Sequence, residues 1–359
     1  MTEADVNSRS GFFGTALQAA SYQGHLDTVK VLLEYGARVN EQGGHYGNAL
    51  QAASIAGDEA IVRRLIQEGA DVNRQSSHYE IKSALIAASK CGHAAIVQML
   101  LEYGADVNAP VPFVHDLYSD SRTMTGSIPT ALVAAPSQGH GSIVHMLIQA
   151  GADVNLQGGN ADSALMAACL GGQEAIVRTL IDSGADVNAQ GGHYGNALVA
   201  ACLKQHEAII RKLIDGGANI NARGGLFGSA IVAASSLGHE ATVGMLIESG
   251  ADVNLKDEKY GNALAAASFG GHEAVVRILM KSGADNINAR GGDYENAITA
   301  ASVPGHEAVV RMLIEGGADV NIQGGLFGNA LRVASICGHE AIVQLLVDNG
   351  AVRASKRTV

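Results

Sequence analysis

A unit of about 33 residues recurs along this chain of 359 residues, and the repetition constrains the fold more than any other feature. Each unit contains an alanine followed by leucine or isoleucine, and successive alanines stand 33, 35, 47, 33, 33, 33, 33, 34 and 33 residues apart. Most units close on Gly-Ala-Asp-Val-Asn or a close variant. These two landmarks define ten units. The marker alanines are Ala16, Ala49, Ala84, Ala131, Ala164, Ala197, Ala230, Ala263, Ala297 and Ala330.

Each unit predicts two short helices. A helix-capping residue precedes every marker alanine, and a glycine ends most of the first helices. The second helix carries apolar residues at i, i+3 and i+4, as at Val275, Ile278 and Leu279. Five second helices also place an arginine four residues after a glutamate, as at Glu307 and Arg311, and we expect ion pairs there. The cap residues are Thr15, Asn48, Ser83, Thr130, Ser163, Asn196, Ser229, Asn262, Asn296 and Asn329.

Two helices of this length bury too little apolar surface to be stable alone, so neighbouring units must stack into one continuous core. Composition agrees, because the chain has 45 glycines, which suit recurring turns, and only 4% aromatic residues with no tryptophan. The predicted fold is an all-α solenoid with short β-hairpin-like loops. The expected repeats start near residues 8, 41, 74, 109, 156, 189, 222, 255, 289 and 322, form a single domain over 1–359, and end in a tail at 351–359.

The order helix, Gly-His, helix, Gly-Ala-Asp-Val-Asn in 33 residues resembles the ankyrin repeat family. The usual Thr-Pro-Leu-His opening is replaced here by Asn-Ala-Leu-Gln at 48–51. The pattern Gly-Gly-x-(Tyr/Phe)-Gly-Asn-Ala-Leu is similar to tandem arrays of filamentous fungi, which often follow a nucleotide-binding module in receptor-like proteins. Residues 4–7 match the end of a preceding unit, so we expect either a piece of a longer array or a chain that has lost its upstream part.

Charge and cysteine usage argue against several functions. The net charge of −11 disfavours unspecific binding to nucleic acid or to an anionic membrane. The four cysteines form no C-x-x-C pair, so we expect no disulfide framework, no metal site and a reducing, cytoplasmic setting. No apolar run is long enough for a membrane span, and no signal peptide or phosphate-binding loop occurs. We therefore predict no cofactor and no catalytic residue.

The aromatic residues suggest a binding surface, because most of those in the units stand six residues after a landmark asparagine. Two interpretations are open: a ladder of rings that steadies the hairpins, or rigid anchors for a partner. The candidate partner-binding aromatics at this position are Tyr46, Tyr79, Tyr194, Phe227, Tyr260, Tyr294 and Phe327. Four residues before the rings, three successive units carry Arg223, Lys256 and Arg290, which favour an acidic or phosphate-rich ligand or else form a solvated face.

A second candidate is the residue after the leucine of each first helix, which is apolar in six successive units from Ile86 to Ala265. If this column faces solvent it marks a groove for a partner, and if it packs inward it belongs to the core. The histidines recur mostly once per unit between the two helices, and a role in that turn explains them.

The largest irregularity is an insertion at 109–129, which also carries the candidate contact residues Phe113, His115 and Tyr118. It is a tolerated surface loop, a binding loop or a lid. Pro136 follows it and should disturb the first helix of the fourth repeat. Together these features predict a non-enzymatic scaffold that binds a protein or peptide on its concave surface. The alternatives are a small-molecule binder or enzyme with the insertion as a lid, and a spacer or oligomerising arm.

Overall fold

The structure, a computed structural model, describes residues 5–9, 11–76, 83–109, 130–157, 163–283, 287–323 and 328–352. Twenty α-helices lie in these segments, two for each repeat, and this confirms the predicted all-α architecture. The first helices are α1 (Ala16–Tyr22), α3 (Ala49–Ala56), α5 (Ala84–Cys91), α7 (Ala131–Ala134), α9 (Ala164–Leu170), α11 (Ala197–Leu203), α13 (Ala230–Ser236), α15 (Ala263–Gly270), α17 (Ala297–Ser302) and α19 (Ala330–Cys337). The second helices are α2 (Leu26–Glu34), α4 (Glu59–Gln67), α6 (Ala94–Glu102), α8 (Gly141–Gln149), α10 (Glu174–Asp182), α12 (Glu207–Asp215), α14 (Glu240–Glu248), α16 (Glu273–Lys281), α18 (Glu307–Glu315) and α20 (Glu340–Asp348).

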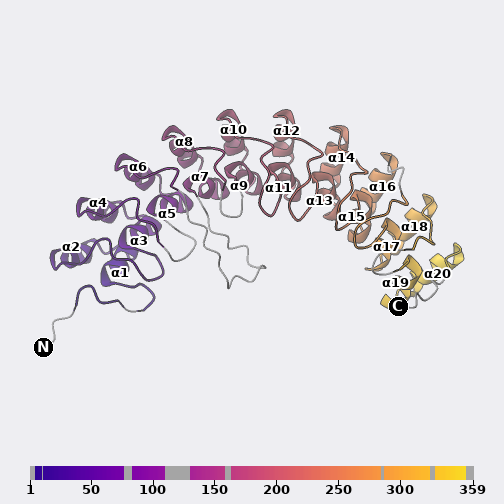
Figure 1. Cartoon of the computed structure of the whole chain (residues 1–359), viewed down its shortest axis with the longest axis horizontal. Coiled ribbons are helices and arrows are strands. Elements are labelled where there is room, and N and C mark those ends of the chain that lie inside the picture. Colours follow the sequence, from indigo (N-terminus) through magenta and orange to yellow (C-terminus); the bar gives the residue numbers. More distant parts are fainter. Residues whose placement is uncertain are drawn as a thin grey trace. The chain divides into compact units, whose positions relative to one another are not determined.

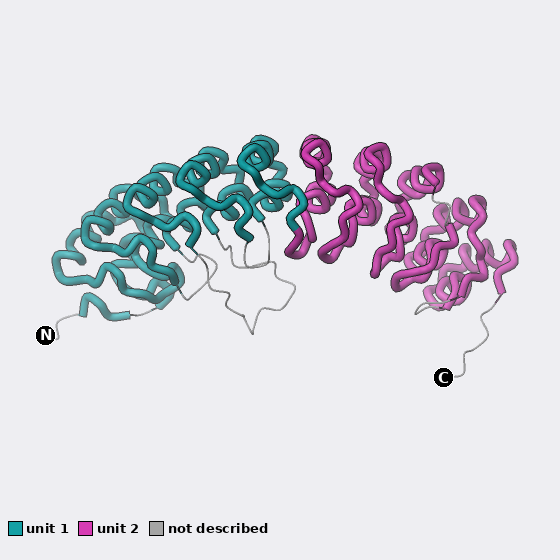
Figure 2. The backbone as a smooth tube through the Cα atoms, turned by 45° about the horizontal axis from the view of Figure 1, so that its top comes forward, with its two compact units in different colours: residues 1–189 teal, residues 190–359 magenta. Residues whose placement is uncertain are grey.

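The chain divides into two compact units, residues 1–189 and 190–359, at the boundary between the fifth and sixth repeats (Figure 2). Within each unit the first helices form one layer and the second helices another, and the loops between repeats project from the first-helix side (Figure 1). The loops are short hairpins with isolated β-bridges, such as Gly43 to Gly47 and Gly191 to Gly195.

Helix starts follow the sequence closely. Nine of the ten predicted cap residues accept a hydrogen bond from a backbone N–H in the first turn, and Ser229 is the exception. Pro136 acts as expected, because α7 stops after one turn and a short 3₁₀ helix, η1 (Pro136–Gln138), completes this first helix.

The core of each unit lies between the layers, where small residues allow close contact. Ala52, Ala53, Ala87 and Ala88 of unit 1 have no exposed surface, so neighbouring first helices approach at their alanine faces. Leucines of the second helices pack against them and are equally buried, as Leu65 is. The column from Ile86 to Ala265 is buried throughout and therefore belongs to the core, so the groove interpretation of these residues is wrong.

Within each unit, asparagine side chains join successive repeats, an arrangement that we call the asparagine clamp. Asn155 donates its side-chain N–H to the carbonyl of Gly184 (3.0 Å) and accepts from the backbone N–H of Asp186 (2.8 Å). Asn40 makes the same pair of bonds to Gly69 and Asp71. The landmark asparagine thus has a structural role: its hydrogen bonds hold successive helix pairs in a fixed arrangement.

Candidate functional site

The surface on the first-helix side is built from two sets of residues that the fold brings together. One set is the hairpin aromatics, which are half-exposed wherever the structure describes them. The other is the residue in the last turn of each first helix, which is half-exposed in every repeat except the fourth and the last, where it is exposed. We call this second set the last-turn column: Tyr22, Ile55, Lys90, Ser137, Leu170, Leu203, Ser236, Phe269, Val303 and Ile336.

Aromatic rings connect the two sets in unit 1. The ring of Tyr46 stacks on that of Tyr22, with centroids 4.1 Å apart and planes 14° from parallel. Phe13 contacts the same tyrosine pair, and Phe12 stacks on His45 at 4.4 Å. Burial and the neighbouring Tyr22 hydroxyl raise the pKa of Tyr46 to about 12. The first two hairpins are therefore fixed to α1 by a cluster of rings.

Unit 2 contains two further groups of ring contacts. Tyr194 and Phe227, from successive hairpins, stack with centroids 6.0 Å apart. Tyr294 stacks on Phe269 of the last-turn column at 4.6 Å, and Tyr260 lies 6.2 Å from the same phenylalanine. Hairpin rings therefore contact each other or the last-turn column in both units, which favours the interpretation that they steady the hairpins. The rings remain partly exposed, so the same residues are available to a partner.

The backbone of neighbouring hairpins supports these ring contacts. The N–H of Leu226 donates to the carbonyl of His193 (2.9 Å), and the N–H of Asp293 donates to that of Lys259 (2.8 Å). This contact requires glycine, because a Cβ on Gly225 would lie 2.4 Å from the nitrogen of Gly195. The residue also has a φ of +62°, which favours glycine. The repeated Gly-Gly pair therefore allows the backbones of successive hairpins to pack against each other.

The hairpin at 256–261 has Asp257 and Glu258 where other hairpins have Gly-Gly. The carboxylate of Asp257 accepts from the backbone N–H groups of Lys259 (3.0 Å) and Tyr260 (2.7 Å) and closes the turn itself. The ammonium group of Lys259 lies 4.7 Å from the centre of the Tyr260 ring. The hydrogen bond to Tyr260 raises the pKa of Lys259, so this lysine stays charged.

The three cations predicted in successive repeats, Arg223, Lys256 and Arg290, are not all available to bind a ligand. Arg290 donates to Glu295 (2.6 Å) and to the backbone carbonyl of Gln323, so its guanidinium is held within its own hairpin and the next. The side chains of Arg223 and Lys256 are exposed and make no hydrogen bond or ion pair to other described residues. Two of the three cations thus face solvent.

The histidines between helices have a structural role, as predicted. Five of them donate a ring N–H to a carbonyl of the last-turn column in the preceding repeat, as His306 does to Phe269 (3.1 Å). These five bonds hold the exposed end of a first helix against the turn between the two helices of the next repeat. The last-turn column itself was missed by sequence reasoning, and its one signal is that this position changes from repeat to repeat while its neighbours stay small.

Several predicted residues fall outside the described segments. They are Tyr79, Phe327 and the three candidates of the insertion, Phe113, His115 and Tyr118. In the described part of the chain, no helix is long and apolar enough to cross a membrane. Across the same residues, no group of three or more potential metal-ligating side chains comes together.

Helix pairs stacked in a fixed register, joined by hairpins that project on one side, define a helical repeat protein. A family model of ankyrin repeats in three copies matches residues 2–76, 18–111, 130–224 and 230–324, and the chain belongs to the ankyrin repeat family. A search of the curated proteins finds no match. Among solved structures, the ankyrin repeat domain of human ASB11 is similar in fold, with 24% identity and a TM-score of 0.55. That match covers 66% of this chain and 99% of the ASB11 chain.

Proposed function

We propose that this chain is a non-enzymatic scaffold that binds a protein or peptide partner on its first-helix side. The surface consists of the hairpin aromatics and the last-turn column of each unit. Ankyrin repeats are generally scaffolds for protein–protein interaction, and this use supports the assignment.

One observation carries the proposal: large apolar side chains remain exposed on this side although the fold is rich in small residues. Leu226 is 65% exposed at a hairpin tip of unit 2, and Leu237, which follows α13, is 46% exposed. Phe269 and Val303 of the last-turn column are half-exposed in the same unit. Interface hot spots are rich in rigid aromatic rings, and exposed apolar patches mark interaction sites.

Lysine substitutions in the last-turn column test this surface without touching the core. Lys90 already stands in this column, so the fold accepts lysine there. We expect Leu203→Lys with Val303→Lys to abolish capture of a partner that the unchanged chain retains from the native cell extract. The matched control is Ala241→Lys with Ala274→Lys, which adds the same charge to exposed positions of α14 and α16.

Circular dichroism of both variants checks that the repeats stay folded. A partner retained by the Leu203→Lys, Val303→Lys variant and lost by the control would place binding on the second-helix side and overturn the proposal. Alanine at Tyr194, Phe227, Tyr260 and Tyr294 together then tests the hairpin rings, and undiminished binding would exclude them as anchors.

A further inference from the structure

Two neighbouring repeats of unit 1 depart from the repeat pattern at charged positions. The residue after the landmark asparagine is apolar in the later repeats but is Glu41 and Arg74 here. Arg38 stands where most units have the aspartate of Gly-Ala-Asp-Val-Asn. Framework residues recur because the fold needs them, so charged departures that cluster in space point to a ligand. The apolar equivalents are Ala109, Leu156, Ala189, Ala222, Leu255, Ala289 and Ile322.

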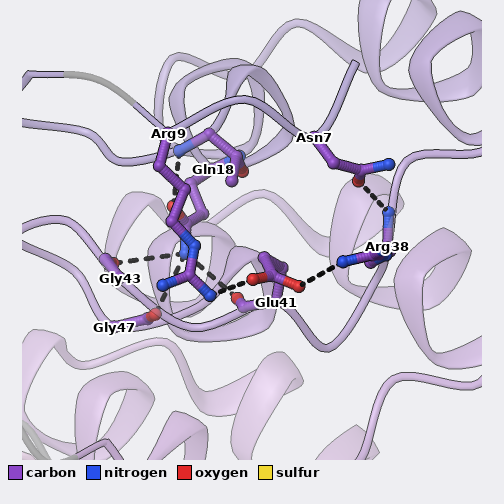
Figure 3. A network of polar contacts seen from close by, with 8 residues as sticks. Asn7, Arg9, Gln18, Arg38, Glu41, Gly43 and Gly47 are labelled. Atoms are coloured by element: carbon purple, nitrogen blue, oxygen red, sulfur yellow. Dashed lines mark hydrogen bonds and ion pairs between the residues drawn. The ribbon is translucent and has the colours of Figure 1, made fainter. Parts of the chain in front are cut away.

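Two of these departures, Glu41 and Arg74, line one cavity of about 450 Å³ together with Arg9, Gly43 and Ser76. Arg9 forms an ion pair with Glu41, and its side chain lies over Gly43 (Figure 3). Arg38 approaches the other carboxylate oxygen of Glu41 at 3.8 Å. The first two hairpins therefore place two guanidinium groups around one carboxylate.

Arg74 completes the wall from the third hairpin. Its side chain is exposed and forms no ion pair or hydrogen bond with any other described residue. Arg9 and Arg74 line the cavity with Glu41, and Arg38 lies beside Glu41 outside the lining, so guanidinium groups outnumber carboxylates among the charged residues that line the cavity. They stand in a chain whose net charge is −11, so the local excess is opposite to that of the whole molecule.

We propose that this cavity binds the dianionic group of a phosphate monoester. Arginine presents a planar fork of N–H donors that matches phosphate oxygens, and Arg9 and Arg74 offer two such forks to one dianion. Arg74 contacts the phosphate from one wall and Arg9 from the other. Glu41 pairs with Arg9 when the cavity is empty, and it competes with the phosphate for the Arg9 guanidinium group. Both free phosphate and a phosphorylated side chain carry this group.

The test is a calorimetric titration of the full chain at low salt with three probes. They are inorganic phosphate, the peptide Ala-Ala-phosphoserine-Ala-Ala and the same peptide with unmodified serine. We expect the two phosphate probes to bind and the unmodified peptide not to bind. A phosphopeptide that binds about tenfold more tightly than inorganic phosphate assigns the site to a phosphorylated partner, and equal binding assigns it to free phosphate.

Variants taken from the repeats themselves keep the fold intact. Arg74→Leu reproduces Leu156 and Leu255, and Arg9→Gln reproduces the glutamine that several repeats carry at this position. Each should weaken phosphate binding by about tenfold or more. The control is Arg223→Gln, which removes one charge at the position of unit 2 equivalent to Arg9 and should leave binding unchanged.

Glu41→Ala distinguishes a phosphate site from a purely structural ion pair. Alanine is common at this position, and its introduction frees Arg9 and Arg38. We expect tighter phosphate binding, whereas a structural ion pair predicts no binding in any variant. Binding should also weaken below about pH 6, where a phosphate monoester loses its second charge. The proposal is overturned if neither phosphate probe binds at low salt, if Arg223→Gln weakens binding as much as Arg74→Leu, or if Glu41→Ala weakens it.

Discussion

The ring of Tyr294, in the hairpin before α17, stacks on the ring of Phe269 in the last turn of α15, with centroids 4.6 Å apart and planes 24° from parallel. This contact joins a hairpin to the first helix of the preceding repeat. Tyr46 and Tyr22 make the same contact in unit 1. A ring at the hairpin position therefore has two possible tasks, to stabilise the array and to contact a partner, and stability measurements isolate the first.

The Phe269–Tyr294 stack should contribute measurable coupling. Phe269→Leu introduces the residue found at Leu170 and Leu203, and Tyr294→Ala introduces the small residue found at 161. In a double-mutant cycle of urea unfolding, we expect a coupling of about 0.5–1.5 kcal/mol. Pairing Phe269→Leu with Tyr194→Ala, which lies two repeats before Phe269, is the control and should give no coupling. Equal values in both cycles would show that the stack adds nothing.

Gly57, between α3 and α4, and Gly69, which follows α4, offer a matched pair of turn glycines. Both have positive φ, +82° and +87°, so alanine at either position costs about 1–2 kcal/mol of backbone strain. A Cβ on Gly57 would also lie 2.5 Å from Cε1 of His93, whereas nothing lies within 4 Å of a Cβ on Gly69. Gly57→Ala should therefore lower the free energy of unfolding by more than Gly69→Ala does. Adding His93→Ala should remove much of that difference, and a difference that persists would contradict the clash.

The asparagine clamp should control local opening between repeats. Asn155→Ala removes two hydrogen bonds to the next repeat and should destabilise the array by about 1–2 kcal/mol. Hydrogen exchange at the backbone N–H of Asp186 should accelerate, because that group loses its acceptor. Gln98→Ala, which removes an exposed hydrogen bond within α6, should leave exchange at Asp186 unchanged. Similar exchange in both variants would show that the clamp does not hold the interface.

Repetition made much of this fold predictable, because the caps and turn glycines are local signals that recur in most repeats, and nine of the ten predicted caps form. The first helices were harder to orient. They consist largely of small apolar residues, so no polar face indicates which side meets solvent. Gln18 illustrates the difficulty: it is a polar residue in the core column, yet it is buried and donates to the backbone carbonyls of Glu41, Gly43 and Gly47 (Figure 3). Its side chain therefore supplies hydrogen bonds to the next hairpin from inside the core, whereas the last-turn column faces outward.

Contacts between charged side chains were the least predictable part. Of the five expected Glu–Arg pairs on second helices, only Glu307 with Arg311 comes within ion-pair distance, at 2.8 Å. Exposed pairs of this kind contribute little, so sequence spacing alone does not fix their geometry. Arg9, Glu41 and Arg74 belong to three successive hairpins, and only the stacking of repeats shows that they line one cavity.

Tyr46 should titrate later than an ordinary tyrosine. Burial and the adjacent Tyr22 hydroxyl raise its pKa from 10.0 to about 12, because both favour the neutral phenol in the folded state. The resulting stabilisation is fully present below about pH 10 and is lost as the pH rises from 10 to 12. Absorbance at 295 nm should show a late ionisation step that disappears in Tyr46→Phe. In Tyr22→Phe the step should move to lower pH but stay above 10, since burial remains the larger cause. The prediction is contradicted if the late step disappears in Tyr22→Phe and is unchanged in Tyr46→Phe. That result would assign the raised pKa to Tyr22.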